Sequence, residues 1–242
     1  MVLKDVDTGA VGPAYARIAG DLRARSAELP PHTLLPSERE IAEEFHVSRM
    51  TARQAVSVLE SEGSVYRRPP RGTFVAEPRV RFQIGSFTEQ VERLGRNPHA
   101  SVLEAFKARA TRAQATALGI PLGRPVHVLS RLRLADAEPL AIERTVIPAG
   151  LTPGLLERPL DGSIWAIMRD AYDLVPTTAS VVLESRTLDH EASRLLGVRV
   201  GALGMVLTRH TTDGRGRCVE YAQDTYRADR TAFEFSATLG SR

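Results

Sequence analysis

Two arginines on one predicted strand and a glutamate on the next are the clearest candidates for ligand binding in this 242-residue chain. Arg131 and Arg133 are two residues apart, so they share one face of a strand. Pairing the apolar residues Leu132 and Ile142 across the predicted hairpin fixes its register. In that register Glu143 lies opposite Arg131. Such a group suits an anion such as a phosphate or carboxylate. The alternative is a solvated outer sheet face with a cross-strand ion pair of little energetic value.

A second group of arginines lies near the N-terminus, at the start of a predicted helix. Arg49 and Arg53 are one helical turn apart and lie away from the apolar stripe of that helix. Only His46-Val47 separates this helix from the short helix before it. Two helices joined by so tight a turn, with arginines in the first turns of the second, form the arrangement that reads DNA. The alternative is a surface helix pair with solvated arginines.

Capping residues, and a change from helical to strand-like spacing after Gly63, define the elements that position these arginines. Ser37 and Glu40 form a capping box at the start of the first helix, and Ser48 caps the second. Gly63 ends the second helix. Two strand-like segments follow, and 69–71 (Pro-Pro-Arg) is the turn between them. A hairpin with an arginine at its tip beside a recognition helix is a wing. The sequence therefore predicts a winged helix-turn-helix.

Residues 35–75 resemble the winged helix-turn-helix of GntR-family transcription regulators. The motifs that carry the resemblance follow in family order: LPSEREIAEEF, SRMTARQAV, LESEG and RGTFV. His46 stands where the family usually has glycine, and Pro70 replaces a common wing glycine. The resemblance implies a homodimer that binds a palindromic operator in double-stranded DNA. The DNA-binding residues implied by the match are Arg39, Ser48, Arg49, Thr51, Arg53, Arg68, Arg71 and Gly72.

The C-terminal half alternates helices with hairpins, which predicts an α+β domain with a mainly antiparallel sheet. The main segments are a strand at 102–107, a helix at 111–118, and hairpins at 126–134/140–147 and 205–212/218–227. This half resembles the UTRA effector-binding domain of the HutC branch of the GntR family, whose fold is like that of chorismate lyase. The motifs are SFTEQ, RLRLAD, PLAIERTVIP and CVEYAQDTY. The hairpins argue against the all-helical, metal-binding effector domain of another GntR branch.

The UTRA resemblance implies a pocket for a small anionic effector such as a sugar phosphate, with the Arg-x-Arg strand holding the phosphate. The effector-binding residues expected on this basis are Ser86, Phe87, Thr88, Arg131, Arg133, Glu143, Ser163, Trp165, Glu220 and Tyr226. Ser86 and Ser163 begin predicted helices whose N–H groups suit an anion, and a plain helix cap is the alternative. For Glu220 and Tyr226 the alternative is a pair of surface residues. A non-phosphorylated carboxylate or another metabolite is the alternative effector.

The predicted domain organisation is a DNA-binding domain at 1–75, with a leader at 1–12, a linker at 76–84, and an effector-binding and dimerisation domain at 85–242. The length suffices for two hydrophobic cores. The effector is expected to act on DNA binding through the linker. It does so by binding one arrangement of the dimer more tightly than the other.

Several classes of protein are excluded by the composition. The single cysteine, Cys218, rules out an intramolecular disulfide, and no apolar run approaches ~20 residues, so a cytoplasmic protein without a membrane partner is expected. The six histidines are scattered without metal-binding spacing, and no P-loop, GxSxG or GxGxxG motif occurs. We therefore expect no cofactor, no metal and no catalysis. The alternative from another class is a chorismate-lyase-like enzyme fused to a DNA-binding domain.

Overall fold

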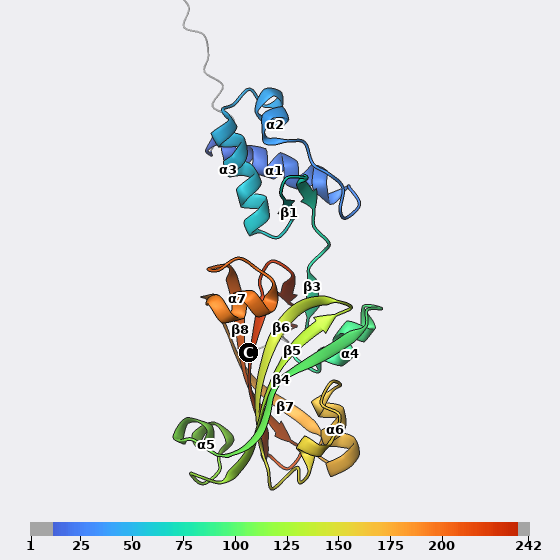
Figure 1. The fold of residues 1–242 in the computed structure, drawn as a ribbon, viewed down its shortest axis with the longest axis vertical. Coiled ribbons are helices and arrows are strands. Elements are labelled where there is room, and N and C mark those ends of the chain that lie inside the picture. Colours follow the sequence, from blue (N-terminus) through green and yellow to red (C-terminus); the bar gives the residue numbers. More distant parts are fainter. Residues whose placement is uncertain (1–11, 237–242) are drawn as a thin grey trace, which may run out of the picture. The chain divides into compact units, whose positions relative to one another are not determined.

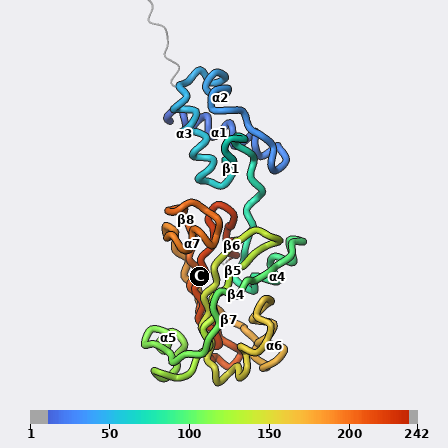
Figure 2. Tube along the Cα trace, viewed as in Figure 1, coloured from blue at the N-terminus to red at the C-terminus, as the bar shows by residue number. Residues whose placement is uncertain are grey.

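The computed structural model describes residues 12–236, and the chain divides into two compact units, Met1–Arg79 and Val80–Arg242. Figure 1 labels the helices and strands of each unit, and Figure 2 traces the chain through them. The predicted leader, apart from its last residue, lies outside the described residues.

The N-terminal unit has three helices and a two-stranded antiparallel sheet, as predicted. Its elements are α1 (Ala14–Ala27), α2 (Glu38–Glu44), α3 (Arg49–Ser61), β1 (Val65–Arg68) and β2 (Gly72–Val75). The capping box of Ser37 and Glu40 is present, and the Ser48 hydroxyl accepts from the backbone N–H of Thr51. Apolar residues of all three helices form one core, which includes Ile18, Ile41 and Leu59. These contacts hold α3 with its N-terminal turns exposed.

The turn between α2 and α3 contains one unusual backbone conformation. His46 has a φ of 52°, in the left-handed region that glycine adopts most easily. This is the position at which the family usually has glycine. The chain therefore keeps the shape of the turn with a residue that is strained there.

The C-terminal unit is built on a six-stranded antiparallel sheet with the strand order β4-β5-β6-β9-β8-β7. The sheet strands are β4 (Pro98–Arg109), β5 (Pro125–Ala135), β6 (Glu138–Pro148), β7 (Pro176–Thr187), β8 (Leu203–Asp213) and β9 (Cys218–Arg227). The helices are α4 (Phe87–Arg93), α5 (Arg112–Leu118), η1 (Leu155–Glu157), α6 (Ile164–Tyr172) and α7 (His190–Leu196). The predicted α+β class with a mainly antiparallel sheet is confirmed.

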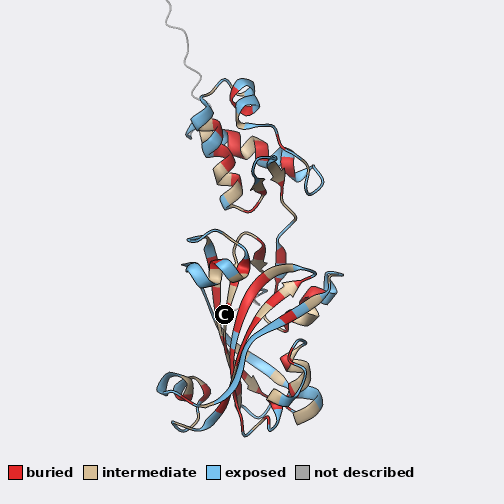
Figure 3. Ribbon diagram, in the orientation of Figure 1, coloured by how far each residue is buried: buried red, intermediate tan, exposed pale blue. Residues whose placement is uncertain are grey.

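Both faces of the central strands are covered. On one face α6 packs through Ile164 and Met168 against Leu129 of β5. On the other face α5 packs at one end of the strands and α7 at the other, so that Leu118 contacts the β5–β6 pair. Figure 3 shows β5 and β6 mostly buried. The alternative of a solvated sheet face around Arg131 is therefore wrong, because α4 and α6 cover it.

The predicted linker is partly structured. Val80–Phe82 form a short strand, β3, that pairs in parallel with β10 (Thr231–Phe233). Val80 and Phe82 are buried while Arg81, between them, is exposed. The second half of the predicted linker 76–84 thus belongs to the C-terminal unit.

Candidate functional site

The ten residues expected to bind an effector surround one cavity of the C-terminal unit. They come from α4, β5, β6, α6 and β9, which are distant in sequence. The lining consists of Ser86, Phe87, Thr88, Arg131, Arg133, Glu143, Ser163, Trp165, Glu220 and Tyr226, together with Gly85, Ile164, Arg209 and Asp224. The predicted register of the β5–β6 hairpin is also found, with Arg131 opposite Glu143.

Arg131 is a buried cation whose hydrogen bonds are nearly all made within the protein. The residue is 1% exposed. Nε donates to Glu143 at 3.2 Å, and Nη2 donates to the same carboxylate oxygen. Nη1 donates to the backbone carbonyls of Leu160 and Gly162, each at 2.8 Å. Arg131 therefore fastens the segment before α6 to the sheet and keeps little donor capacity for a ligand.

Arg133 is buried to the same degree but is incompletely satisfied. Nη1 donates to Glu143 at 3.2 Å and Nη2 donates to the Thr88 hydroxyl at 2.9 Å. Its Nε is buried and has no hydrogen-bond partner. The guanidinium carbon lies 4.6 Å from the centre of the Phe87 ring, which holds the plane of the group in place. A buried donor without a partner is costly, so an anion at this position would be stabilised.

A second set of buried charges lies beside the first, on β8 and β9. Arg209 Nε donates to Glu220 at 3.2 Å, and its Nη1 lies 3.4 Å from an oxygen of Asp224. Glu220 also accepts from Trp165 Nε1 at 3.0 Å and from the Thr211 hydroxyl at 2.9 Å. The second oxygen of Asp224 is buried without a partner. The carboxylate of Asp224 is thus the least satisfied of the three in the cavity.

Arg209 and Asp224 were not among the residues predicted from the sequence. Both lie in the second hairpin, in segments that read MVLTRHTT and CVEYAQDTY. A charged residue in the middle of each strand was the available signal. In the register of this hairpin Ala222 lies opposite Arg209. Glu220 and Asp224 are each two residues from Ala222, so they lie on the same face of the sheet as Arg209.

Burial and pairing shift the pKa values of these groups in opposite directions. Burial alone would raise the pKa of Glu143, but the guanidinium groups of Arg131 and Arg133 lower it to about 2. Burial raises the pKa of Asp224 to about 7, because Arg209 compensates only in part. Burial likewise lowers the pKa of Arg133, against the attraction of Glu143. At neutral pH Asp224 is therefore partly protonated, and the cavity carries a net positive charge below one unit.

Two helix starts meet at the edge of the cavity. Ser86 caps α4 and Ser163 caps α6, and their hydroxyl oxygens are 3.2 Å apart. The space left between the lining side chains is about 20 Å³, which holds about one water molecule. Small-molecule sites occupy roughly 300 Å³ or more, so the lining side chains must move apart before an effector can bind.

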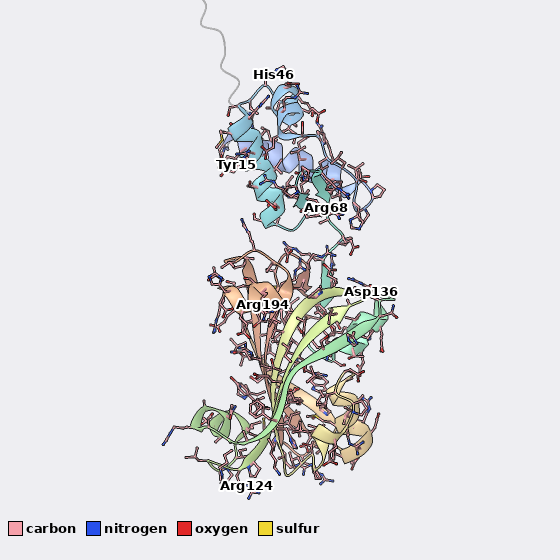
Figure 4. The ribbon with its side chains drawn as sticks, viewed as in Figure 1. Tyr15, His46, Arg68, Arg124, Asp136 and Arg194 are labelled. Carbon is pink, nitrogen blue, oxygen red and sulfur yellow. The ribbon has the colours of Figure 1, made fainter. Side chains whose placement is uncertain are left out.

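The surface expected to contact DNA carries several free cations. Arg49, at the start of α3, and Arg68 and Arg71, in the wing, are exposed. Among residues 12–236, none of these three side chains has an ion pair or a side-chain hydrogen bond. Figure 4 shows Arg68 at the edge of the N-terminal unit. Unpaired guanidinium groups on a recognition helix and a wing can bind phosphates without first losing an intramolecular partner.

The other residues expected to contact DNA have partners within the unit. Arg53 donates to Glu38 at 3.0 Å, and Arg39 lies 4.0 Å from Glu43. Ser48 and Thr51 share a hydrogen bond between their hydroxyls at 2.9 Å. Gly72 has a φ of 120°, as the wing requires. A contact of Arg53 with DNA would therefore require it to release Glu38, whereas a contact of Arg49 would break no ion pair of the described residues.

The described part of the chain contains no group of three or more His, Cys, Asp or Glu side chains that could hold a metal ion. Between residues 12 and 236, no helix is long and apolar enough to cross a membrane.

Comparison with known proteins agrees with both units. Residues 14–75 match the family described as bacterial regulatory proteins, gntR family, and residues 93–232 match the UTRA domain. The HTH-type transcriptional repressor NagR of Bacillus subtilis is 36% identical over 227 residues, covering 91% of this chain and 93% of NagR. The HTH-type transcriptional repressor PhnF of Mycolicibacterium smegmatis is 32% identical over 201 residues, covering 82% of each chain. The crystal structure of PhnF superimposes with a TM-score of 0.66 at 29% identity, covering 93% of this chain and 100% of that chain. The chain therefore belongs to the GntR family, in the branch with a C-terminal UTRA domain, and is a ligand-responsive transcription regulator rather than an enzyme.

Proposed function

We propose that the chain represses transcription as a homodimer that binds a palindromic operator. The C-terminal cavity binds a small anionic effector, a sugar phosphate, and the bound effector lowers the affinity for DNA. The observation that carries the effector assignment is the buried Nε of Arg133, which has no partner and belongs to a group that lines the cavity.

DNA binding is assigned first to Arg49 and to the wing residues Arg68 and Arg71, because these exposed cations have no partner to lose. Arg49→Ala is expected to cost about 1–3 kcal/mol of operator affinity if the contact is to a base. A contact to phosphate would instead weaken all sequences alike and reduce the salt slope by about one. Arg17→Ala, which removes another exposed arginine of the same unit, is the control. Operator binding that survives removal of Arg49 together with Arg53 would contradict the assignment.

Arg133 is the proposed anion contact, and Arg131 has a supporting role. Arg131 donates its hydrogen bonds to Glu143 and to two backbone carbonyls. In Arg133, Nε has no partner and each terminal nitrogen donates to one oxygen only. A phosphate has enough acceptor oxygens to satisfy these donors. The hydroxyls of Thr88 and Ser163 also line the cavity and can donate further hydrogen bonds.

A sugar phosphate suits the remainder of the lining better than a purely apolar anion. Glu220 and Asp224 also line the cavity and can accept hydrogen bonds from hydroxyls or an amine. Asp224 still has an unpaired oxygen for this purpose. A simple carboxylate would satisfy Arg133 but would leave this oxygen of Asp224 without a donor.

Isothermal titration of the full chain tests the effector proposal. A hexose 6-phosphate should bind more tightly than millimolar, and the unphosphorylated hexose should not. Arg133→Gln is expected to weaken binding by about 10- to 100-fold, the equivalent of about 1.4–2.8 kcal/mol, while operator affinity stays unchanged. Arg169→Gln, an exposed change on α6, is the matched control. If no sugar phosphate binds but a carboxylate or uncharged ligand does, the phosphate assignment is wrong.

Dimerisation is supported by the two edge strands of the sheet. β4 and β7 are each twelve residues long and expose apolar side chains, among them Phe106 and Val182. Long edges with exposed apolar residues tend to associate with another chain. Sedimentation of the full chain should therefore give a dimer at micromolar concentration, and a monomer would refute the proposal.

Aromatic contacts connect the effector cavity to β3. Phe82 of β3 lies with its ring centre 5.3 Å from that of Phe87 and 5.3 Å from that of Tyr226. Phe87 and Tyr226 line the cavity, and β3 follows directly after residues 76–79. We infer that an effector that moves α4 also moves β3, which gives the coupling a physical route.

A further inference from the structure

A second cavity lies at the α5 end of the C-terminal unit. Its volume is about 860 Å³, and its walls come from α5, the residues after β6 and the β8–β9 hairpin. His210 lines this cavity, and it follows Arg209 on β8. Because neighbouring residues of a strand point to opposite faces, the second cavity lies on the other side of the sheet from the effector cavity.

One side of the second cavity is apolar. Leu118 and Ile120 from α5 and its C-terminal turn, and Pro148 and Leu151 from the end of β6 and beyond, contribute this surface. Leu118 is anchored in a buried cluster with Val126. The apolar wall is therefore held by the core of the unit.

The charged residues of the lining all have the same sign. They are Lys107, Arg124 and Arg217, and no aspartate or glutamate lines the cavity. Arg217 is neutralised by Asp213 at 2.7 Å. Lys107 lies opposite His127 in the β4–β5 register, so its side chain points to the other face of the sheet and its charge is directed away from this cavity. Arg124 is exposed, and within the described range 12–236 it has no ion pair or side-chain hydrogen bond. Figure 4 shows Arg124 at this end of the unit. The cavity therefore has one uncompensated positive charge, that of Arg124.

Two of the uncharged polar side chains of the lining, His210 and Cys218, are directed to the backbone. His210 Nδ1 donates to the carbonyl of Ala117 at 3.0 Å, and the thiol of Cys218 lies 3.7 Å from the same oxygen. Both residues are thereby fixed against the end of α5. The cavity presents to a ligand mainly an apolar wall and the guanidinium group of Arg124.

We propose that this cavity is a second ligand site, which binds organic acids with an apolar body. The carboxylate pairs with Arg124, and the hydrocarbon or aromatic part lies on Leu118, Ile120 and Leu151. The volume is within the range of about 300–1,000 Å³ that small-molecule sites occupy. A sugar phosphate is disfavoured here, because its hydroxyls would lose water against an apolar wall without gaining partners.

Cys218 provides a direct readout, because it is the only cysteine of the chain and lies in the cavity wall. Burial raises the pKa of its thiol, so its modification by the uncharged reagent 4,4′-dithiodipyridine is followed at pH 8.5. Octanoate and 1-octanol should both slow this reaction, but octanoate should reach the same slowing at a concentration at least about tenfold lower. A tenfold difference in concentration corresponds to about 1.4 kcal/mol of binding free energy from the carboxylate. Isothermal titration with octanoate should give the same dissociation constant.

Three variants separate this site from the alternatives. Arg124→Gln should remove the advantage of octanoate over octanol, whereas Arg112→Gln, an exposed change on α5, should leave it intact. Arg133→Gln should also leave it intact, because that residue belongs to the effector cavity. Equal protection by octanol and octanoate, or full protection in the Arg124→Gln variant, would overturn the proposal. It is also overturned if Cys218 reacts more slowly as protein concentration rises and octanoate has no effect, since a second copy of the chain would then cover the cavity.

Discussion

Replacing Asp224 by asparagine should change how the stability of the C-terminal unit depends on pH. Burial raises the pKa of this carboxyl from its ordinary value of 3.8 to about 7. Between these two values the folded protein holds a proton that the unfolded chain has lost. The stability that this proton contributes is fully present below pH 3.8, and it falls as the pH rises through 7.

The size of the effect follows from the two pKa values. At 1.36 kcal/mol per pH unit, the whole difference corresponds to about 4 kcal/mol. Most of this stabilisation is already lost as the pH rises to 6, and a further loss of about 1–2 kcal/mol occurs between pH 6 and pH 8. Asparagine keeps an oxygen that can accept from Arg209 and has no charge to bury. Relative to the wild type, Asp224→Asn should therefore gain about 1–2 kcal/mol of unfolding free energy between pH 6 and pH 8.

Urea unfolding followed by tryptophan fluorescence measures this difference. Trp165 is the only tryptophan of the chain and lies in the C-terminal unit, in contact with Glu220, so its emission reports on that unit alone. Asp170→Asn, an exposed change on α6, is the control and should follow the wild type at each pH. If the curves of the wild type and Asp224→Asn are parallel from pH 6 to pH 8, Asp224 is ionised throughout. The description of the cavity as incompletely neutralised would then be wrong.

Three further changes test other parts of the structure. His46→Gly should stabilise the N-terminal unit by up to about 1 kcal/mol in thermal unfolding, because it removes a left-handed conformation from a residue with a Cβ; a lower melting temperature would contradict this. Glu38→Gln should release Arg53 and raise the affinity for non-operator DNA, with a salt slope steeper by about one in titrations from 50 to 200 mM salt; an unchanged slope would show that Arg53 does not reach DNA. Phe82→Leu should change effector affinity by less than about threefold, which is less than ~1 kcal/mol. It should nevertheless weaken the effector-induced release of operator in gel-shift assays, because it removes the ring contact with Tyr226. Undiminished release would rule out the coupling of the cavity to β3 through Phe82.

The elements that were predicted correctly are those specified by nearby residues. Ser37, Ser48 and Gly63 mark the ends of α2 and α3 through bonds to residues one turn away. The register that places Arg131 opposite Glu143 follows from a single hairpin, in which the apolar residues have one sensible match. Local chemistry was sufficient in both cases.

The features that were missed depend on contacts between distant segments. The burial of Arg131 and Arg133 requires α4 and α6 to cover the sheet, and neither strand of the hairpin encodes that cover. Arg209 and Asp224 join the cavity because β9 pairs with β6, which the sequence of either strand alone does not reveal. The strand at Val80–Phe82 is three residues long, too short for a clear alternating pattern.

The pairing of β3 with β10 has a consequence for the order in which the chain is made. These strands are separated by about 150 residues, so β3 has no partner until the ribosome has synthesised nearly the whole protein. The N-terminal unit is made first, and its core is complete by Val75. Domains generally fold as units during synthesis, the N-terminal one first. We therefore expect a nascent chain whose DNA-binding unit is already folded while β3 still waits for its partner. A ribosome stalled before residue 231 would hold a protein that can contact DNA but cannot yet transmit an effector signal through β3.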